Sequence, residues 1–146
     1  QEKDIRPGTE PMPAIAGFFG AMEELRIKEC LSQLTEKRNY LASELQKRSF
    51  VTINSPDNAL PYIVNFSLNG LRSETVLNFL SDMEIYVSSG SACSKGHKSP
   101  VLTAMGLEND IIDSSLRVSM SRFTTKEQLD YLLSAIDTAA KVIRKK

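Results

Sequence analysis

The sequence lacks several features that would point to common classes of binding protein. Its 146 residues carry 18 basic and 18 acidic side chains, so no net charge would attract nucleic acid or an anionic membrane surface. No apolar run is long enough to cross a bilayer, and the first residues do not form a signal-like segment. The sequence therefore predicts a cytoplasmic protein without nucleic-acid or membrane partners.

Metal-binding side chains are also scarce. The chain has one histidine, His97, and two cysteines, Cys30 and Cys93, which lie in very different surroundings. Cys93 and His97 are close in sequence, but a zinc site needs four ligands and the chain offers too few, so no metal is expected. Two cysteines of this kind indicate free thiols in a reducing compartment.

Phosphate-binding motifs, repeats and low-complexity segments are missing as well. Neither of the two glycine-containing loops, 6–9 and 90–92, matches a P-loop or the strand, GxGxxG and helix arrangement of a dinucleotide site. What remains is an average composition, 41% hydrophobic and 25% charged, in a chain of 146 residues. That is enough for one folded domain with its own core.

The beginning of the chain indicates a piece of a longer protein. Gln1 leads at once into a polar segment rich in glycine and proline, which we interpret as a connecting loop over residues 1–13. Apolar residues then recur at steps of three and four, which predicts one long amphipathic helix over residues 14–47. At about 1.5 Å per residue such a helix is roughly 50 Å long, so part of it should pack against an absent domain or a second copy.

Short β-rich runs and turn residues follow the long helix. The pattern predicts strands over 50–54, 62–68, 85–87 and 116–121, and helices after Ser73, over 100–105 and over 124–143. Ser73, Ser99 and the pair Thr124 and Glu127 have the spacing of helix N-caps. The predicted fold class is α+β: a small mixed or antiparallel sheet faced by helices, with a long amino-terminal helix.

Cys93 is the candidate nucleophile. It lies in a predicted loop of small residues, 88–96, beside Lys95 and close to His97 and Lys98, whose positive charges would stabilise a thiolate. A free cysteine can equally be an inert small hydrophobic residue, which is our interpretation of Cys30 within the long helix. From the local sequence alone, both interpretations of Cys93 stay open.

Arg117 is the candidate anion-binding residue. It alternates with Leu116 and Val118, which places it on the polar face of the strand predicted over 116–121. A guanidinium group can bind a carboxylate through two parallel hydrogen bonds. An arginine in such a place can also be an ordinary surface or ion-pair residue, and the sequence pattern does not separate the two.

Four short motifs occur in order along the chain. They are Arg6-Pro-Gly-Thr-Glu10 with Pro13-Ala-Ile-Ala-Gly17, Ser88-Ser-Gly-Ser-Ala-Cys93, Ser114-Ser-Leu-Arg-Val-Ser119, and Arg122-Phe-Thr-Thr125. In this order and spacing they resemble the carboxy-terminal third of the bacterial cysteine desulfurases, the NifS- and IscS-like branch of the class V aminotransferase fold. The resemblance covers nearly the whole chain, and the cysteine motif is its most specific part.

The resemblance implies that residues 1–146 are the small domain of a homodimeric pyridoxal-phosphate enzyme. Cys93 would attack the sulfur of L-cysteine bound to pyridoxal 5'-phosphate, leaving alanine and a persulfide that passes to a sulfur-acceptor protein for iron-sulfur cluster or thio-cofactor assembly. Arg117 matches the arginine that holds the substrate's α-carboxylate. Thr9 matches a threonine that reaches the cofactor phosphate of the partner subunit.

The resemblance also implies a missing part. The large domain of these enzymes carries the lysine that binds the cofactor, and neither Lys95 nor Lys98 matches that position, so we expect the isolated fragment to be inactive. Two alternatives remain. One is a selenocysteine lyase or another class V aminotransferase, in which the cysteine is dispensable; the other is a cofactor-free sulfur-carrier or partner-binding module.

Overall fold

A small antiparallel sheet forms the centre of the fold. The computed structural model describes residues 8–89 and 99–143. Within these residues four strands pair in the order β1-β2-β4-β3, and every neighbouring pair is antiparallel. The strands are β1 (Val51–Ile53), β2 (Ile63–Leu68), β3 (Ser88–Ser89) and β4 (Ser115–Ser119). The predicted α+β class is confirmed, with the sheet antiparallel rather than mixed.

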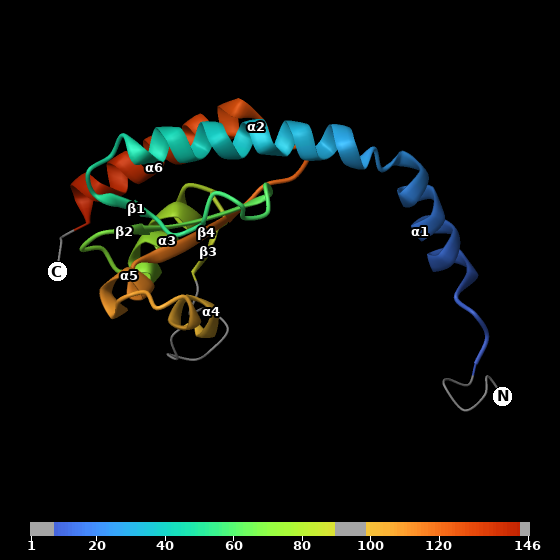
Figure 1. Cartoon of the computed structure of the whole chain (residues 1–146), viewed down its shortest axis with the longest axis horizontal. Coiled ribbons are helices and arrows are strands. Elements are labelled where there is room, and N and C mark those ends of the chain that lie inside the picture. Colours follow the sequence, from blue (N-terminus) through green and yellow to red (C-terminus); the bar gives the residue numbers. More distant parts are fainter. Residues whose placement is uncertain (1–7, 90–98, 144–146) are drawn as a thin grey trace.

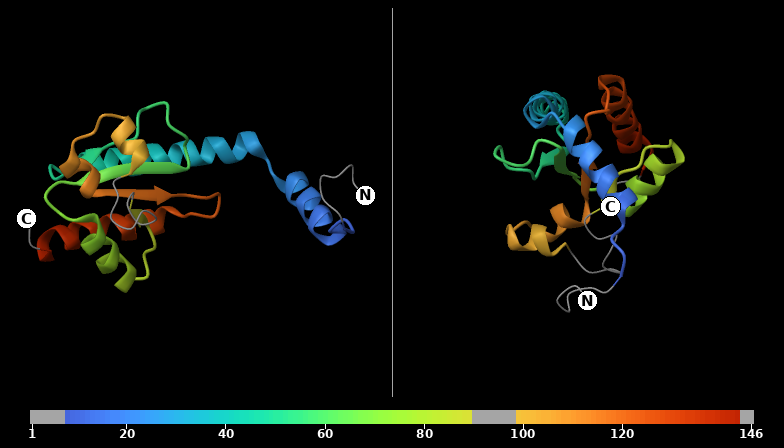
Figure 2. Two further views of the ribbon diagram at one scale, coloured as in Figure 1. Left: turned by 90° about the horizontal axis from the view of Figure 1, so that it is seen from below. Right: turned by 90° about the vertical axis from the view of Figure 1, so that its right-hand side faces the viewer.

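The two faces of the sheet are covered by different helices. Two long helices, α2 (Ile27–Gln46) and α6 (Lys126–Val142), lie side by side over one face, and α3 (Ser73–Asp82) packs beside α6. Two short helices, α4 (Pro100–Ala104) and α5 (Asn109–Asp113), lie on the other side (Figure 1 and Figure 2). The sheet therefore has one face under long helices and one face that is only partly covered.

The core lies between the sheet and the long helices. Alternate residues of β2, among them Val64 and Phe66, point to this side and are 1% and 0% exposed. They pack in one cluster with Leu116 of β4 and with Leu41 and Leu45 of α2. Burial of each such side chain contributes about 1.5–3 kcal/mol to folding. The apolar residues of the helices, which recur every 3.6 residues, and those of the strands, which recur every two, therefore face each other in one core.

The single helix predicted over residues 14–47 is wrong: the chain forms two helices, α1 (Met12–Glu24) and α2. Leu25 has an extended backbone and Arg26 has non-helical backbone angles, and together they interrupt the helix. None of the residues of α1 is buried, and this helix projects away from the sheet (Figure 1 and Figure 2).

The apolar stripes explain the break. The stripe of α1 that includes Phe19 and Met22 would continue to Arg26, a charged residue, whereas the buried stripe of α2 that includes Leu34 projects back to Ile27. The two stripes therefore lie on different faces of a continuous helix. The interruption at Leu25 and Arg26 lets α1 and α2 point in different directions, so the apolar stripe of each helix can face a different surface.

Helix caps differ from the sequence prediction by about one residue. Ser99 caps α4 as expected, because its Oγ accepts from the backbone N–H of Leu102 at 3.4 Å. The capping box of α6 is formed by Thr125 and Gln128 rather than by Thr124 and Glu127. Ser73 is the first residue of α3 rather than its N-cap; Arg72 occupies the N-cap position and makes no side-chain capping hydrogen bond. Cap spacing in a sequence fixes a helix start only to within a residue or two.

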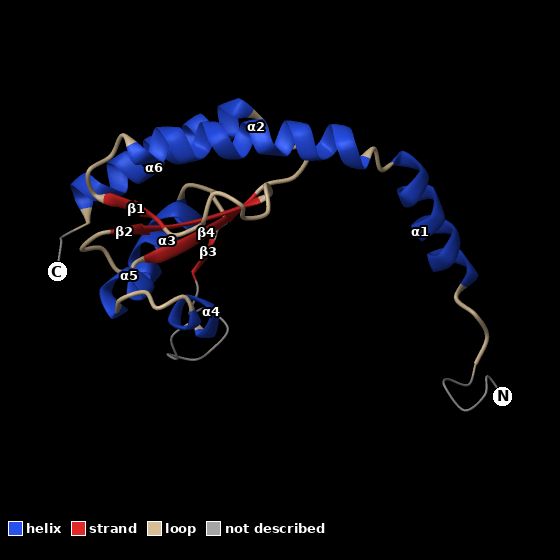
Figure 3. Ribbon diagram, viewed as in Figure 1, coloured by secondary structure: helices blue, strands red, loops and turns tan. Residues whose placement is uncertain are grey.

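Two elements near the site were predicted wrongly. The strand predicted over 85–87 lies at Ser88–Ser89, inside the segment predicted as loop, and helix α5 was not predicted (Figure 3). In the run 85–87, Ile85 and Val87 instead supply partly buried side chains to the core, whereas Tyr86 is 81% exposed. Within the described residues no helix combines the length and apolar character needed to cross a membrane.

Candidate active site around Arg117

A row of polar side chains crosses the whole sheet on the face opposite the long helices. Arg117 of β4 is directly opposite Asn65 of β2 on one side and Ser88 of β3 on the other. Asn54, which follows β1, continues the row because its N–H donates to the carbonyl of Asn65 at 2.9 Å. Directly opposed residues share a face of an antiparallel pair, so these four side chains lie on one face.

A cavity of about 460 Å³ lies over this row. All four side chains of the row line it, and α4 contributes an apolar wall. The rest of the lining comes from residues 55 and 56, Ile63, and the serines Ser89 and Ser99. A concave site with apolar walls and a few convergent polar groups is the usual form of a small-molecule site.

The Asn54 end of the row is held by a hydrogen-bond network. Asn54 Nδ2 donates to Asn65 Oδ1 and to Ser67 Oγ, both at 2.8 Å, and Ser67 Oγ donates to the carbonyl of Ile111 at 2.7 Å. Asn54 itself is only 8% exposed. A buried network of this kind fixes side-chain orientation, because each broken bond leaves a buried polar group unpaired.

The neighbouring wall is tied to a long helix. Arg38 of α2 donates from Nη1 to the carbonyl of Asp57 at 3.1 Å and from Nη2 to the carbonyl of Pro56 at 2.7 Å. Ser55 Oγ accepts from the backbone N–H of Asn65 at 2.8 Å. The loop that borders the cavity is therefore positioned from both α2 and β2.

Arg117 is available to bind an anion. It is exposed, and its Nη2 donates to Ser88 Oγ at 3.5 Å. Among the described residues no carboxylate forms an ion pair with it, although five other pairs are present. The guanidinium thus lies at a cavity without a protein anion beside it, the arrangement expected of a carboxylate-binding arginine.

Cys93 lies outside the described residues, as do Lys95, His97 and Lys98. The residues that flank this part of the chain are described. Ser89 ends β3 and Ser99 caps α4, and both are buried and line the Arg117 cavity. The segment 90–98 therefore leaves and re-enters the described structure at the same cavity.

Thr9 does not approach this cavity within one chain. It is exposed, precedes α1, and is not among the residues that line the cavity. Helix α1 leads away from the sheet (Figure 2). The structure thus brings Arg117 together with both ends of the Cys93 segment, and does not bring Thr9 to them.

The lining of the cavity fits a substrate carboxylate better than a whole cofactor. It offers a guanidinium, two amides and several hydroxyls, but no lysine amine among its described residues. No group of three potential metal ligands occurs in the described part of the chain. Cys30, on α2, is half-buried and free, and it is not part of the cavity lining.

Sequence reasoning missed Asn54 and Asn65. The sequence does contain a pattern that could have predicted Asn65: it alternates with the apolar residues of β2, so its side chain must lie on the face of the strand opposite the core. No such pattern exists for Asn54, since its place opposite Asn65 depends on how β1 and β2 pair.

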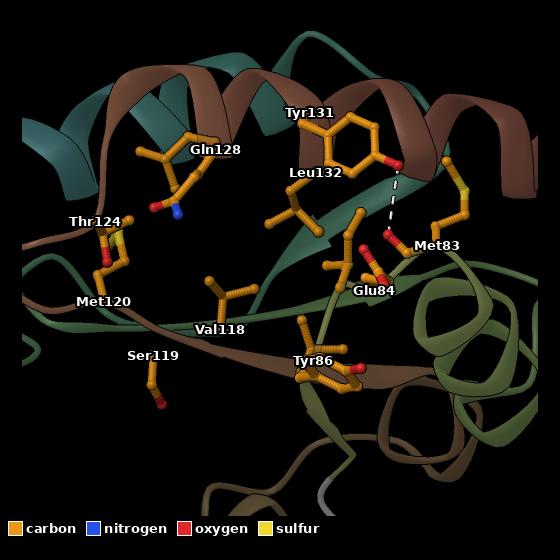
Figure 4. A pocket seen from close by; sticks show the side chains of 13 residues that line it. Met83, Glu84, Tyr86, Val118, Ser119, Met120, Thr124, Gln128, Tyr131 and Leu132 are labelled. Atoms are coloured by element: carbon orange, nitrogen blue, oxygen red, sulfur yellow. Dashed lines mark hydrogen bonds between the residues drawn. The ribbon is translucent and has the colours of Figure 1, made fainter.

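A second cavity, of about 580 Å³, lies between the start of α6, the end of β4 and residues 83–87 (Figure 4). Its lining includes Val118, Leu132 and Tyr131, whose hydroxyl donates to the carbonyl of Met83 at 3.3 Å. Neither Arg117 nor Thr9 lines it. The Arg117 cavity is therefore the better candidate site.

Comparison with known proteins shows the family of this chain. The sequence matches the aminotransferase class-V family over residues 1–132. The chain belongs to this family. Among the similar class-V proteins is cysteine desulfurase IscS of Dictyoglomus turgidum, 35% identical over 150 residues, which cover 99% of this chain and 38% of the relative. The mitochondrial cysteine desulfurase of Saccharomyces cerevisiae is also 35% identical, over 99% of this chain and 30% of its own length.

Solved class-V structures agree with the sequence matches. A NifS-like protein from Rickettsia africae superimposes with a TM-score of 0.80 at 32% identity, over 97% of this chain and 38% of that protein. Another NifS-like protein gives a TM-score of 0.81 at 30% identity, over 98% of this chain and 37% of its own. The chain thus spans 30–38% of the length of these relatives.

Proposed function

We propose that this class-V chain is the carboxy-terminal small domain of a cysteine desulfurase, with residues 1–13 as the connecting loop. The single observation that carries the proposal is the cavity at which Arg117 and both ends of the Cys93 segment meet. In this proposal Arg117 is the carboxylate-binding group, and Cys93, between Ser89 and Ser99, is the nucleophile. The names of the similar proteins support the same function.

The substrate in this proposal is L-cysteine. Arg117 binds its α-carboxylate through two parallel hydrogen bonds, which fixes the position of the substrate in the cavity. The Cys93 thiolate then attacks the substrate sulfur: a sulfur–sulfur bond forms, the carbon–sulfur bond breaks, and the carbon takes up a proton. The products are L-alanine and a persulfide on Cys93, which a sulfur-acceptor protein receives.

The proposal includes pyridoxal phosphate, which supplies the electron sink that weakens bonds of a bound amino acid. This chain contributes Arg117 and Cys93 to the reaction. We place the lysine that holds the cofactor in a large domain outside this chain. In a homodimer of the complete enzyme, Thr9 would contact the cofactor phosphate of the other subunit, and we propose a cytoplasmic location for that enzyme.

Replacement of Cys93 tests the function. In the full-length protein, Cys93→Ala should lower the rate of sulfide release from L-cysteine, measured with a reductant, by roughly 100-fold or more, because no other group takes its place as nucleophile. The matched control is Cys30→Ala, which removes the other thiol away from the cavity and should keep the parental rate.

A parental rate in Cys93→Ala would contradict the proposal. That outcome would instead favour a class-V enzyme in which the cysteine is dispensable, such as a selenocysteine lyase. Turnover of selenocysteine by the same two variants separates these possibilities.

A further inference from the structure

The orientation of the Asn65 side-chain amide follows from the hydrogen bonds beneath the cavity. Ser67 Oγ donates its only hydrogen to the carbonyl of Ile111 at 2.7 Å, so towards Asn54 it can only accept. Asn54 must therefore present its Nδ2 to Ser67, at 2.8 Å. The second hydrogen of the same Nδ2 is donated to Asn65 Oδ1, also at 2.8 Å. With the Ser67 hydroxyl donating to Ile111, only this orientation of the two amides gives both the Asn54–Ser67 and the Asn54–Asn65 hydrogen bonds.

This network turns the amide nitrogen of Asn65 away from β1. Because Oδ1 of Asn65 faces Asn54 on the β1 side, Nδ2 faces the β4 side, where Arg117 is the directly opposed residue. Nδ2 has two hydrogens to donate, and none of the described residues accepts from it, whereas the backbone N–H of Asn65 donates to Ser55. Asn65 thus presents a free donor on the cavity side of the sheet.

Asn65 and Arg117 form the close type of cross-strand pair. The backbone bonds between β2 and β4 include Met120 N–H to the carbonyl of Tyr62 at 2.8 Å and Leu68 N–H to the carbonyl of Ser114 at 3.1 Å. Even-numbered residues of β4 therefore bond to β2, and Arg117 belongs to a pair without backbone bonds. In such pairs the Cα atoms are only about 4.5 Å apart and the side chains approach closely.

We propose that Asn65 is a second donor to the carboxylate that Arg117 binds, and so a specificity-determining residue for α-carboxylate ligands. One carboxylate oxygen accepts from Asn65 Nδ2 while the guanidinium donates to both oxygens. Ser88 supports Arg117 from its other side, since its Oγ accepts from Nη2 at 3.5 Å. This inference rests on the proposed function for the identity of the substrate, while the donor pair itself is a feature of the cavity.

Calorimetric binding of L-alanine and of L-alaninamide to the full-length holoenzyme tests the inference. L-alanine has the carboxylate and L-alaninamide lacks its charge. Asn65→Asp keeps the shape of the side chain but replaces the donor by a carboxylate, which repels the ligand. The Kd of L-alanine should rise about tenfold or more, while that of L-alaninamide stays the same or falls. Asn65→Ser replaces the amide by a hydroxyl on a shorter side chain, which withdraws the donor from the ligand without adding charge, and it should show the same selective loss.

The matched control is Asn69→Asp, which makes the same chemical change at the end of β2, outside the cavity lining. It should leave both constants within about twofold of the parent. Equal weakening of both ligands in Asn65→Ser would overturn the inference in favour of a structural role, and so would unchanged L-alanine binding in both Asn65 variants.

The two proposals fail separately. A parent that binds L-alanine with this selectivity but releases no sulfide from L-cysteine contradicts the desulfurase function and leaves the Asn65 assignment standing. A parent that releases sulfide, with Asn65 variants that bind L-alanine normally, contradicts only the Asn65 assignment.

Discussion

Arg117 carries most of the chemistry that the described residues can offer. Its position in β4 follows from strand alternation, and its neighbours in the row, Asn65 and Ser88, follow from strand pairing. A planar guanidinium held between two polar neighbours presents its donors in a fixed plane. This arrangement suits a planar, two-oxygen group such as a carboxylate.

Substitution by lysine tests this geometry. Arg117→Lys keeps the positive charge but loses the planar fork, so only one hydrogen bond to the carboxylate can form. The KM for L-cysteine of the full-length protein should rise roughly 10- to 100-fold, measured by steady-state sulfide release. The control Arg72→Lys, outside the cavity, should behave like the parent. An unchanged KM in Arg117→Lys would mean that the carboxylate is bound elsewhere.

At the scale of elements, two polar contacts join α2 and the turn that follows it to α6 above the core. The Tyr40 hydroxyl donates to Asp130, and Lys126 donates to the same carboxylate at 3.0 Å while its Nζ lies 4.6 Å from the centre of the Tyr40 ring. Further along, Arg48 binds Asp137 through two bonds of 2.6 and 2.7 Å, and this hydrogen bonding raises the pKa of Arg48. These contacts fix how the two helices lie along each other over the sheet.

The Asp130 contact should make the stability of the chain depend on pH. The hydrogen bond from Tyr40, and next the one from Lys126, hold the pKa of Asp130 below its ordinary value of 3.8. A carboxylate with a lowered pKa in the folded state stabilises the fold above its unfolded pKa, and that stabilisation is lost as the pH falls through the folded value.

Asp130→Asn should therefore lower the midpoint of urea unfolding at pH 7. The difference between this variant and the parent should shrink as the pH is lowered below about 4. Asp113→Asn, a change at an exposed carboxylate on α5, is the control. If the difference between Asp130→Asn and the parent were the same at pH 7 and pH 3, the ionised carboxylate would not be the source of the stabilisation.

At the scale of the whole molecule, helix α1 and the Arg117 cavity each leave groups exposed that other described parts of this chain do not cover. None of the residues of α1 is buried, and Phe18 and Phe19 on this helix are 69% and 62% exposed. The Arg117 cavity offers no lysine among its described lining residues. Both features agree with a chain that spans only part of the length of its relatives.

The isolated chain should therefore bind no pyridoxal phosphate. Incubation with the cofactor followed by dialysis should leave no cofactor absorbance on the chain, whereas the full-length protein should keep about one equivalent per subunit. The physical reason is that, under the proposed function, the amine that holds the cofactor belongs to a large domain outside this chain. Stoichiometric retention by the chain alone would contradict both this expectation and the division into two domains.

From the sequence alone, β2, β4, α6 and the face of β4 on which Arg117 lies could be predicted. Local patterns carry this information: apolar residues alternate in β2 and β4 and form stripes on α2 and α6. Because one face of the sheet is buried, these patterns fix which side chains face the core. The cap of α4 could also be predicted from nearby sequence, because Ser99 accepts from an N–H only three residues away. The motif around Cys93 likewise indicated the family without any knowledge of the fold.

Only the tertiary structure decided which polar residues join Arg117. Asn54, Asn65 and Ser88 are distant from it in sequence, and they meet it because strand register places them in one row. Register depends on the pairing of whole strands and on the packing of one face, so no local pattern specifies it. The place where α1 ends and α2 begins also became visible only in the structure, in which α2 contributes buried residues to the core and α1 contributes none.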